Sequence, residues 1–395
     1  MAKIIRKLYL GIVYIGLLVL IFFSFPFAYA IYYKKKIWLI SEVDFDARDN
    51  GFALFKYLCK NHPEINSIFL ISKKNIFYEK VKAVGKTIEP KTYKHLLIFI
   101  AAKAKISTIV HGCSPSSLFT QLFLIKHHFT GKNIALKHGI FKNKHPNYFK
   151  QNAHLDMICC GAYPEFKYIE NEFGYQKGVA CYTGLARFDE LHNFDVKNEI
   201  LIMPTWRRWL EKIKDNNDFE KTSFYKEWKG FMQNKTFNSL INKNNITVNF
   251  YLHPKLNNYI SSFSKISSNI KFFSSQKGDD LQDLLKKTRL LITDFSSVFF
   301  DFAYMKKPLI HFQFDEVEFN KHHYLKGYFD YRKDGFGDVC TNKNELIYSI
   351  KKVFSTNFML AKKYYKRVIN FFALNDQANC ERIYSYILKS VNHHK

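Results

Sequence analysis

Short apolar runs of strand length alternate along this chain with segments of helix length. The first series of such runs covers residues 36–41, 67–72, 107–112, 133–139, 155–161 and 178–184. A second series covers residues 199–206, 246–254, 269–275, 289–297 and 308–313. Continuous apolar strands that are separated by helices are typical of parallel sheets covered on both faces. The pattern therefore predicts an α/β protein with two doubly wound, Rossmann-like domains.

The length of the chain agrees with this division. A single hydrophobic core usually stops growing at about 250–300 residues, and this chain has 395. We expect an N-terminal domain over residues 37–195 and a C-terminal domain over residues 196–395. In doubly wound sheets ligands bind beyond the carboxyl ends of the strands, so the residues that follow the predicted strands are the candidates for function.

The segment before the first predicted strand carries no charge from Leu8 to Tyr33. At 1.5 Å per residue, a helix of these 26 residues is longer than the roughly 30 Å hydrocarbon core of a bilayer. Three basic residues flank each end: Lys3, Arg6, Lys7, Lys34, Lys35 and Lys36. A cleaved signal peptide is the alternative, since Ala28-Tyr29-Ala30 resembles a cleavage site, but the apolar run exceeds the usual length of about 7–15 residues. We predict that residues 1–36 are an uncleaved membrane anchor, which Pro26 could kink or make re-entrant.

The charge balance indicates an anionic partner. Lys and Arg total 60 against 34 Asp and Glu, which gives a net charge of +26. Such an excess suits nucleic acid, an acidic membrane surface or phosphate-bearing substrates. The sequence contains no run of seven positive charges, which argues against a nucleic-acid tail. We therefore expect an anionic membrane surface and phosphate-bearing substrates as partners, and no nucleic acid.

The cysteine and acidic patterns do not favour a metal site. The seven cysteines are odd in number and form no C-x-x-C pair, so neither a zinc site nor a complete disulfide framework is expected, and a reducing compartment fits better. Asp44 and Asp46 spell a D-x-D motif, which can bind a metal–nucleotide, but acidic residues are common at strand ends. The chain also lacks a GxGxxG or Walker A loop. We expect no metal.

The most specific strand-end motif is LLITDFSSVFFDFAYMKKP at residues 290–308. A buried strand is predicted to end just before Ser296 and Ser297, which would open a helix that runs to about Lys306. The first N–H groups of a helix lack internal partners and its dipole favours an anion, so two hydroxyls there would form a phosphate cradle. Asp301 lies four residues after Ser297, one turn along the same helix face. The alternative is a plain serine N-cap without a ligand.

Three further strand ends carry basic side chains. Arg207 and Arg208 could form bidentate bonds to phosphate, although a surface Arg pair is more often only solvated. His253 ends another strand, and His138 with Gly139 ends a strand of the first domain. A single strand-end histidine is more often structural than catalytic, but two histidines that face each other across a two-domain cleft would reverse this.

Taken together, these motifs resemble the CDP-glycerol glycerophosphotransferase family, which includes the primases and polymerases of teichoic acid synthesis. The similarity continues to residue 350 and includes KHG, PTWRR and TDFSSVFFDFA in this order; it begins with Glu42, Ala47, Asp49, Asn50 and Gly51. The resemblance implies a fold of the glycosyltransferase-B type, no catalytic metal or other cofactor, and CDP-glycerol as the donor substrate. The family's donor contacts map onto His138, Gly139, Arg207, His253, Ser296, Ser297 and Asp301.

The chain departs from the family pattern at three places. The family usually has W-H-G-T where this chain reads Lys137-His138-Gly139-Ile140, and it often has Arg before the H-P at His253. It favours G-N-P-R-x-D where residues 184–189 read GLARFD. We predict that Gly139, Ile140 and Phe141 bind substrate, and the polyol of the donor stays open between glycerol and ribitol.

The leading hypothesis is an enzyme that transfers glycerol phosphate from CDP-glycerol to a hydroxyl of a lipid-linked or polymer acceptor and releases CMP. Its product would be a teichoic acid, capsule or lipopolysaccharide component. His138 and His253 are the predicted catalytic residues, with His138 as the general base. In the competing interpretation His138 only binds phosphate, and Asp301 or water takes the proton. We expect the protein at the cytoplasmic membrane with its domains facing the cytosol, where CDP-polyols are made.

Other functions are compatible with the same residues. One is a CDP-ribitol ribitolphosphotransferase, and another is a nucleotide-sugar glycosyltransferase of the same fold. A function of a different class is a basic, membrane-associated binding protein without turnover, for which the positive charge would be the whole function. Release of CMP from CDP-glycerol separates the enzyme from the binding protein.

Overall fold

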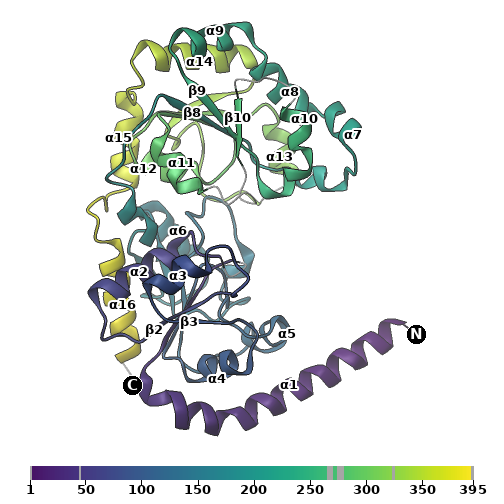
Figure 1. The fold of residues 1–395 in the computed structure, drawn as a ribbon, viewed down its shortest axis with the longest axis vertical. Coiled ribbons are helices and arrows are strands. Elements are labelled where there is room, and N and C mark those ends of the chain that lie inside the picture. The colour runs from purple at the N-terminus through teal and green to yellow at the C-terminus, as the bar shows by residue number, and fades with distance from the viewer. Residues whose placement is uncertain (1, 44–45, 265–269, 274–279, 323–324, 393–395) are drawn as a thin grey trace. The chain divides into compact units, whose positions relative to one another are not determined.

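The computed structural model describes residues 2–43, 46–264, 270–273, 280–322 and 325–392. The chain divides into two compact units (Figure 1). Unit 1 comprises Met1–Ile140, His145–Asp189 and Leu374–Lys395, and unit 2 comprises Phe141–Lys144 and Glu190–Ala373. These units differ from the predicted domains, because the last segment of the chain belongs to unit 1 and four residues after Ile140 belong to unit 2.

Unit 1 is built on a seven-stranded parallel sheet in the order β3-β2-β1-β4-β5-β6-β7. Its strands are β1 (Trp38–Ser41), β2 (Ser67–Leu70), β3 (Thr87–Ile88), β4 (Ala104–Ser107), β5 (Lys132–Ala135), β6 (Met157–Cys160) and β7 (Ala180–Tyr182). Side chains alternate between the two faces along each strand, so Trp38 and Ile40 enter one core while Ile37 and Leu39 enter another. The sheet is therefore covered on both faces, as its continuous apolar strands require.

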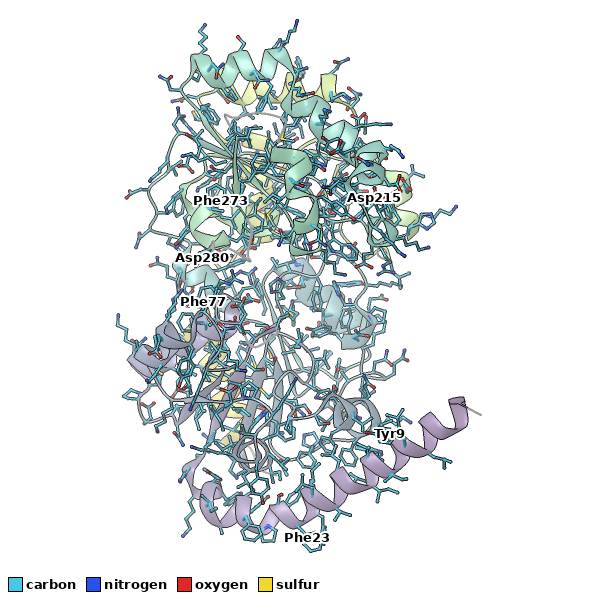
Figure 2. All side chains as sticks on the ribbon, turned by 45° about the vertical axis from the view of Figure 1, so that its right-hand side comes forward. Tyr9, Phe23, Phe77, Asp215, Phe273 and Asp280 are labelled. Carbon is cyan, nitrogen blue, oxygen red and sulfur yellow. The ribbon has the colours of Figure 1, made fainter. Side chains whose placement is uncertain are left out.

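Helices on both sides provide this cover. The core of Trp38 and Ile40 includes residues of α2 (Asn50–Asn61), α3 (Tyr78–Val84) and α16 (Asn379–Asn392). The core of Leu39 includes residues of α1 (Ala2–Tyr32), α4 (Tyr93–Ala101), α5 (Ser117–Phe119) and η3 (Thr120–Leu124). The other helical segments are η1 (Tyr33–Lys35), η4 (Pro146–Tyr148), α6 (Tyr163–Glu172) and η5 (Ala186–Glu190). Within α1 and η1, Leu8–Lys35 is long and apolar enough to cross a membrane by length and composition, and Phe23 points away from the rest of unit 1 (Figure 2).

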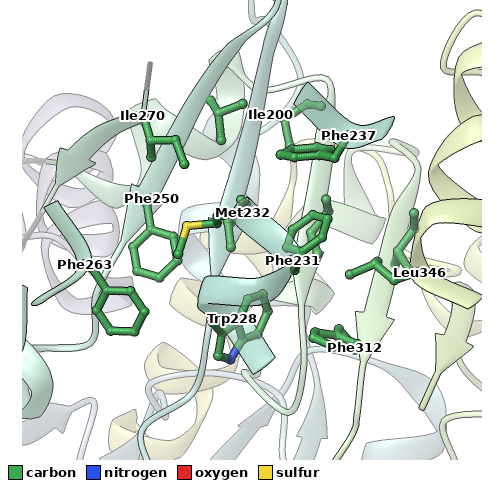
Figure 3. Packing of buried hydrophobic residues seen from close by; sticks show 14 of the residues in the cluster. Ile200, Trp228, Phe231, Met232, Phe237, Phe250, Phe263, Ile270, Phe312 and Leu346 are labelled. Carbon is green, nitrogen blue, oxygen red and sulfur yellow. The ribbon is translucent and has the colours of Figure 1, made fainter. Parts of the chain in front are cut away.

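Unit 2 contains a six-stranded parallel sheet in the order β10-β9-β8-β11-β12-β13. Its strands are β8 (Glu199–Met203), β9 (Thr247–Tyr251), β10 (Ile270–Phe273), β11 (Leu290–Thr293), β12 (Leu309–Phe312) and β13 (Gly337–Cys340). Its helices are η6 (Arg208–Lys212), α7 (Asn216–Lys221), α8 (Ser223–Met232), α9 (Lys235–Lys243), η7 (Pro254–Tyr259), α10 (Ile260–Ser264), α11 (Leu281–Lys287), α12 (Phe299–Tyr304), α13 (Glu316–His322), α14 (Lys343–Ser355) and α15 (Lys362–Phe371). An aromatic core between this sheet and α8, α9 and α14 contains Trp228, Phe231, Phe250 and Phe312 (Figure 3).

The observed strands confirm the predicted fold class, with corrections to individual strands. The predicted strand at 107–112 was wrong. The observed strand, β4, ends at Ser107, and the residues after it form turns. Two strands were missed: β3 has only two residues, and β13 begins with Gly337 and Asp338, which interrupt an apolar run. Each sheet has one place where the strand order reverses, between β1 and β4 in unit 1 and between β8 and β11 in unit 2. Loops at such places are where ligands of this fold class bind.

Candidate active site

His138 lies on a loop after β5, and buried residues of unit 1 fix the backbone of this loop. The preceding residue, Lys137, has a left-handed backbone (φ 62°), and its buried ammonium pairs with the buried carboxylate of Glu165. Glu165 also accepts a hydrogen bond from the backbone N–H of Gly161 at 2.7 Å. Asn50 at the start of α2 donates its amide N–H to the carbonyl of Lys137 at 2.8 Å. The loop is therefore fixed immediately before His138, while the imidazole itself is 72% exposed.

Asp49 orients this imidazole. His138 Nδ1 is hydrogen-bonded to Asp49 Oδ2, and Arg187 donates from Nη1 both to Asp49 Oδ1 at 2.7 Å and to the carbonyl of His138 at 2.8 Å. Burial by itself would raise the pKa of Asp49, but the charges of His138 and Arg187 and their hydrogen bonds bring it below the ordinary value. Asp49 is consequently ionised at neutral pH. With Nδ1–H donating to a carboxylate, Nε2 is the nitrogen that can accept a proton, which is the geometry of a general base.

A second buried carboxylate fixes the backbone around Asp49. Glu42 follows β1 and accepts backbone N–H groups from Arg48 at 2.9 Å, Asp49 at 3.1 Å and Phe52 at 2.6 Å. It lies at the N-terminus of α2, where N–H groups lack helical partners. Burial, together with the nearby charge of Asp49, raises the pKa of Glu42 to about 8. This carboxyl group holds the segment that carries Asp49 rather than facing a substrate.

The predicted substrate-binding loop after His138 presents little side-chain surface. Gly139 is buried, and Ile140 and Phe141 are only 3% and 6% exposed. Ile140 packs beside Gly161. A Cβ added to Gly161 would lie 2.9 Å from the side chain of Ile140. These residues can therefore offer backbone groups to a ligand, whereas their apolar side chains belong to the interior.

In unit 2, Ser296 and Ser297 lie in the turn between β11, which ends at Thr293, and α12. Both are half-buried, and Ser296 Oγ accepts the N–H of Val298 at 3.4 Å. The predicted helix start was wrong by a few residues, since α12 begins at Phe299 and ends at Tyr304. The reason is local: the chain makes a turn through Ser297 and Val298 before the first helical residue. The two hydroxyls remain at the carboxyl edge of the sheet, on the loop where the strand order reverses.

Arg207 does not lie on the surface, as a side chain that binds phosphate directly would. It is completely buried and forms ion pairs with Asp294 at 2.9 Å and with Asp315 at 2.7 Å. A second bond to Asp315, at 2.9 Å, makes that pair bidentate, and Nη1 donates to the carbonyl of Thr205. The expected bidentate contact between Arg207 and a phosphate is therefore not supported, because its fork is already occupied by carboxylates. The adjacent Arg208 is exposed.

Asp294 is the centre of a polar network beneath the Ser296–Ser297 turn. Its Oδ1 accepts the N–H of Thr205 at 2.8 Å, and its carbonyl accepts bonds from His311 Nδ1 and Gln313 Nε2, each at 3.1 Å. Burial lowers the pKa of His311 to about 3, so this imidazole is neutral. Lys142 is also buried near Asp294; burial lowers its pKa to about 8 although the carboxylate opposes this. These residues tie the loops after β8, β11 and β12 together.

The last two predicted residues have different surroundings. His253 is half-buried after β9; its Nδ1 accepts the N–H of Lys255 at 3.3 Å, and its ring lies 6.0 Å from that of Trp206. The loops after β8 and β9 thus meet at this ring pair. Asp301 is buried in α12 and accepts a long bond from Gln282 at 3.5 Å, so its carboxylate does not face solvent. A role for Asp301 as proton acceptor is not supported by this position.

The D-x-D motif, which the sequence analysis discounted as a metal site, lies only partly within the described residues. Asp44 lies outside them, and Asp46 forms an ion pair with Arg48 at 2.6 Å. Within the described ranges, no group of three or more His, Cys, Asp or Glu side chains is placed to hold a metal ion. The residues that sequence reasoning did not place in the site are Asp49, Arg187, Asp294 and Asp315. Asp49 could have been found as a helix N-cap that follows the first strand, but its pairing with His138 spans 89 positions and has no local signal.

Comparisons with known proteins agree with this architecture. The family of CDP-glycerol:poly(glycerophosphate) glycerophosphotransferases matches residues 22–389. The minor teichoic acid biosynthesis protein GgaB of Bacillus subtilis (strain 168) is 30% identical over 374 residues, which cover 92% of this chain and 41% of GgaB. A teichoic acid glycerol-phosphate transferase of Staphylococcus aureus (strain NCTC 8325 / PS 47) is 32% identical over 114 residues, or 28% of each chain.

Among solved structures, a variant of the wall teichoic acid polymerase TagF soaked with CDPG has a TM-score of 0.67. The match has 16% identity and covers 91% of this chain and 90% of that one, so it concerns the fold. The fold class is thus that of a two-domain, parallel-sheet protein with glycosyltransferase-B-like domains. The chain belongs to the CDP-glycerol:poly(glycerophosphate) glycerophosphotransferase family. It spans about two fifths of the length of GgaB.

Proposed function

We propose that this protein transfers glycerol phosphate from CDP-glycerol to a hydroxyl group of a polymer or lipid-linked acceptor. The acceptor oxygen attacks the phosphorus that carries the glycerol, the bond from that phosphorus to the bridging oxygen of CMP breaks, and CMP leaves with the bonding electrons. The acceptor's proton passes to His138 Nε2. Family membership supports the donor and the reaction class.

The observation that carries this proposal is the arrangement of His138 with Asp49 and Arg187. An exposed imidazole that donates from Nδ1 to an ionised, buried carboxylate is held in the tautomer that accepts a proton at Nε2. Arg187 keeps Asp49 in place through a 2.7 Å ion pair. In phosphoryl transfer the protein forms few covalent bonds itself, so a positioned base and charge neutralisation account for most of its contribution to the rate.

The donor phosphates are assigned to the Ser296–Ser297 turn and the loop that carries His253. The serine hydroxyls and His253 can donate hydrogen bonds to phosphate oxygens. Arg207 acts through Asp294, because its buried ion pair fixes the carboxylate that accepts the N–H groups of Thr205 and Phe295. It is therefore a positioning residue for the two loops.

The acceptor is expected at the cytosolic face of the cytoplasmic membrane. The protein would act at the cytoplasmic membrane with both units in the cytosol, where CDP-polyols are made, and its net charge of +26 favours an anionic lipid surface. Protease protection in intact cells tests this side: residues 37–395 should be degraded only after the membrane is opened. Degradation from outside would contradict the assignment.

A substrate screen with the full-length chain tests the reaction itself. CDP-glycerol, CDP-ribitol and nucleotide sugars are incubated with membranes as the source of acceptor, and release of CMP or a nucleoside diphosphate is measured. We expect CMP from CDP-glycerol with the unaltered protein and its loss with His138→Ala. Preferential release from CDP-ribitol would change the polyol and keep the mechanism, whereas release only from a nucleotide sugar would overturn the proposed reaction.

A further inference from the structure

Helix α1 has two faces with different surroundings. Buried or half-buried side chains recur along it at helical spacing, namely Tyr14, Leu17, Leu18, Ile21, Ser24, Phe25, Ala28 and Tyr32. Residues three or four apart share one side of a helix, so these side chains form a single stripe. Ile21 and Ala28 are members of a unit 1 core together with Leu39 and Leu70 of the sheet. The stripe is part of the folded interior of unit 1.

The stripe packs mainly against α4. Ser24 Oγ lies 3.4 Å from Tyr93 Oη at the start of α4, and the ring of Phe25 packs 5.8 Å from that of Phe129. All residues of α4 from His95 to Ala101 are buried, although the sheet can cover only one side of a helix. A helix that is apolar on every side needs cover on every side. α1 provides the cover on the side of α4 away from the sheet (Figure 1).

The opposite face of α1 is apolar and exposed. Its large exposed side chains include Leu8, Ile12, Ile15, Val19, Phe22, Phe23, Phe27 and Ile31. From Leu8 to Ile31 this face extends about 35 Å along the helix. Soluble monomers rarely expose so large a continuous apolar surface, which therefore marks an interaction site.

The packed stripe is incompatible with a helix that crosses a bilayer. It extends from Tyr14 to Tyr32, about 27 Å, which is almost the whole thickness of the hydrocarbon core. Ser24, which contacts Tyr93, lies about 14 Å inside the Tyr33 end of the apolar segment. If α1 crossed the membrane, Tyr93 and the exposed Lys94 beside it would be drawn into hydrocarbon, where a charged side chain is strongly disfavoured.

The charges around α1 indicate which surface it contacts. The first 41 residues contain six basic residues and no acidic residue. Lys34, Lys35 and Lys36 at the C-terminal end are exposed, as are Tyr29 and Tyr33. Basic residues at the ends of an apolar helix face and aromatic residues beside them suit the interface of an anionic leaflet.

We propose that α1 lies in the plane of the membrane, with the Ile12–Phe22–Phe23 face inserted into one anionic leaflet and the Ile21–Ala28 stripe bound to unit 1. Both ends of the helix then stay on the side of the membrane that holds units 1 and 2. The helix is also a permanent part of the fold, since cleavage after Ala30 would remove Ile21 and Ala28 from the core. This inference concerns membrane binding and does not depend on the reaction proposed above.

Labelling of single added cysteines tests the topology. Ala2→Cys marks the start of α1 and Tyr386→Cys marks an exposed position on α16. A membrane-impermeant maleimide is applied to sealed vesicles of either orientation, with the unaltered chain as the background for its seven native cysteines. Labelling of both positions from the same side is expected. Labelling from opposite sides, or a mature chain that begins at Ile31, would overturn the proposal.

Flotation with lipid vesicles tests the inserted face. Ile12→Gln combined with Phe22→Gln should reduce binding to phosphatidylglycerol-containing vesicles by about 10-fold or more, because two large apolar side chains leave the leaflet. The matched control is Tyr348→Gln, an equally exposed position on α14, which should bind as the unaltered chain does. An unchanged melting temperature shows that the fold is kept. Unreduced flotation of the double variant would overturn the proposal. If the unaltered chain self-associates and the double variant loses this self-association but still floats, the face is an interface between two copies, which would also overturn the proposal.

Discussion

The two units present their strand-end charges in opposite ways. In unit 1, a buried Lys137–Glu165 pair lies beneath the loop, and the imidazole of the next residue, His138, is 72% exposed. In unit 2, Arg207 at a comparable strand end is itself buried between two carboxylates, and the half-buried hydroxyls of Ser296 and Ser297 lie at the edge of the sheet. Unit 1 therefore presents an exposed group that can exchange a proton, and at the Ser296–Ser297 turn unit 2 presents hydroxyls beside a buried ion-pair network.

Removal of the exposed imidazole should have the largest effect. His138→Ala should reduce CMP release by about 10²–10⁴-fold, the usual contribution of a general base, and leave CDP-glycerol affinity nearly unchanged. Steady-state turnover and calorimetric binding measure the two quantities. His138→Gln keeps a hydrogen-bonding group but cannot take a proton, so near-normal turnover and an unaltered pH profile in this variant would make His138 a binding residue.

Breaking the buried pair of unit 2 should instead affect stability. Arg207→Ala leaves Asp294 and Asp315 buried without their cation, which should lower the free energy of unfolding by roughly 3–5 kcal/mol. Denaturant unfolding of the purified protein measures the change. The control is Arg208→Ala, because the neighbouring arginine is exposed and should cost little. Equal, small losses in both variants would mean that the buried network contributes less than its geometry indicates.

The carboxylate behind His138 should have an intermediate effect. Asp49→Asn removes a charge-assisted bond of about 1.5–3 kcal/mol, so turnover should fall about 10- to 100-fold. The acidic limb of the pH–rate profile should move to lower pH, because the imidazolium loses the carboxylate that stabilises it. Asp46→Asn, three residues earlier and paired with Arg48, serves as the control. A fall in turnover without a shift of the profile would indicate a purely structural role for Asp49.

The phosphate turn of unit 2 should be less sensitive. Replacement of Ser296 and Ser297 by alanine removes two hydroxyls but keeps the backbone N–H groups, so we expect donor affinity to fall by about 10-fold. Isothermal titration with CDP-glycerol gives the value, and Thr341→Ala, which removes an exposed hydroxyl elsewhere in unit 2, is the control. Unchanged affinity in the double variant would move the donor site away from this turn.

The last prediction concerns the acid sensitivity of unit 2. His311 has a pKa of about 3 in the folded state because it is buried, against an ordinary value near 6.5. As pH falls from 6.5 toward 3, the unfolded chain binds a proton at this residue that the folded chain does not, so the free energy of unfolding decreases by at most about 1.4 kcal/mol per pH unit. His311→Asn keeps a donor near Nδ1 and cannot titrate in this range, so its stability should depend less on pH. Melting temperatures between pH 4 and 7 would contradict this if both proteins changed equally.

The sequence was sufficient for the fold class because apolar strands repeat with helical spacers between them. It was insufficient for β3 and β13, whose few residues gain their strand conformation from neighbouring strands rather than from an apolar run of their own. The strand at 104–107 was predicted too late in the sequence, at 107–112. The reason is Lys105, which is buried within the strand, whereas a lysine in the sequence does not indicate a buried strand.

The same limit explains the outcome for the candidate site. The positions of His138, Ser296 and Ser297 after their strands could be predicted because strand ends and turn residues are local signals. The burial of Arg207 was not predicted, since Asp315 is 108 positions away and only the fold brings the two together. Asp301 was expected on the ligand side of its helix, but that turn of α12 packs into the interior. The role of a side chain at a strand end thus depends on partners far away in the sequence, which the spacing of apolar residues does not reveal.

The division of the chain has a consequence for the order in which the protein folds during synthesis. The core of unit 1 includes Cys380, Ile383 and Ile387 of α16, which the ribosome makes only after all of unit 2. Unit 2 can therefore complete its sheet while unit 1 still lacks one of the helices that cover its own. A stalled or truncated chain would expose the Trp38 and Phe55 surface that α16 shares, and a protein quality-control system would recognise that apolar surface as unfinished.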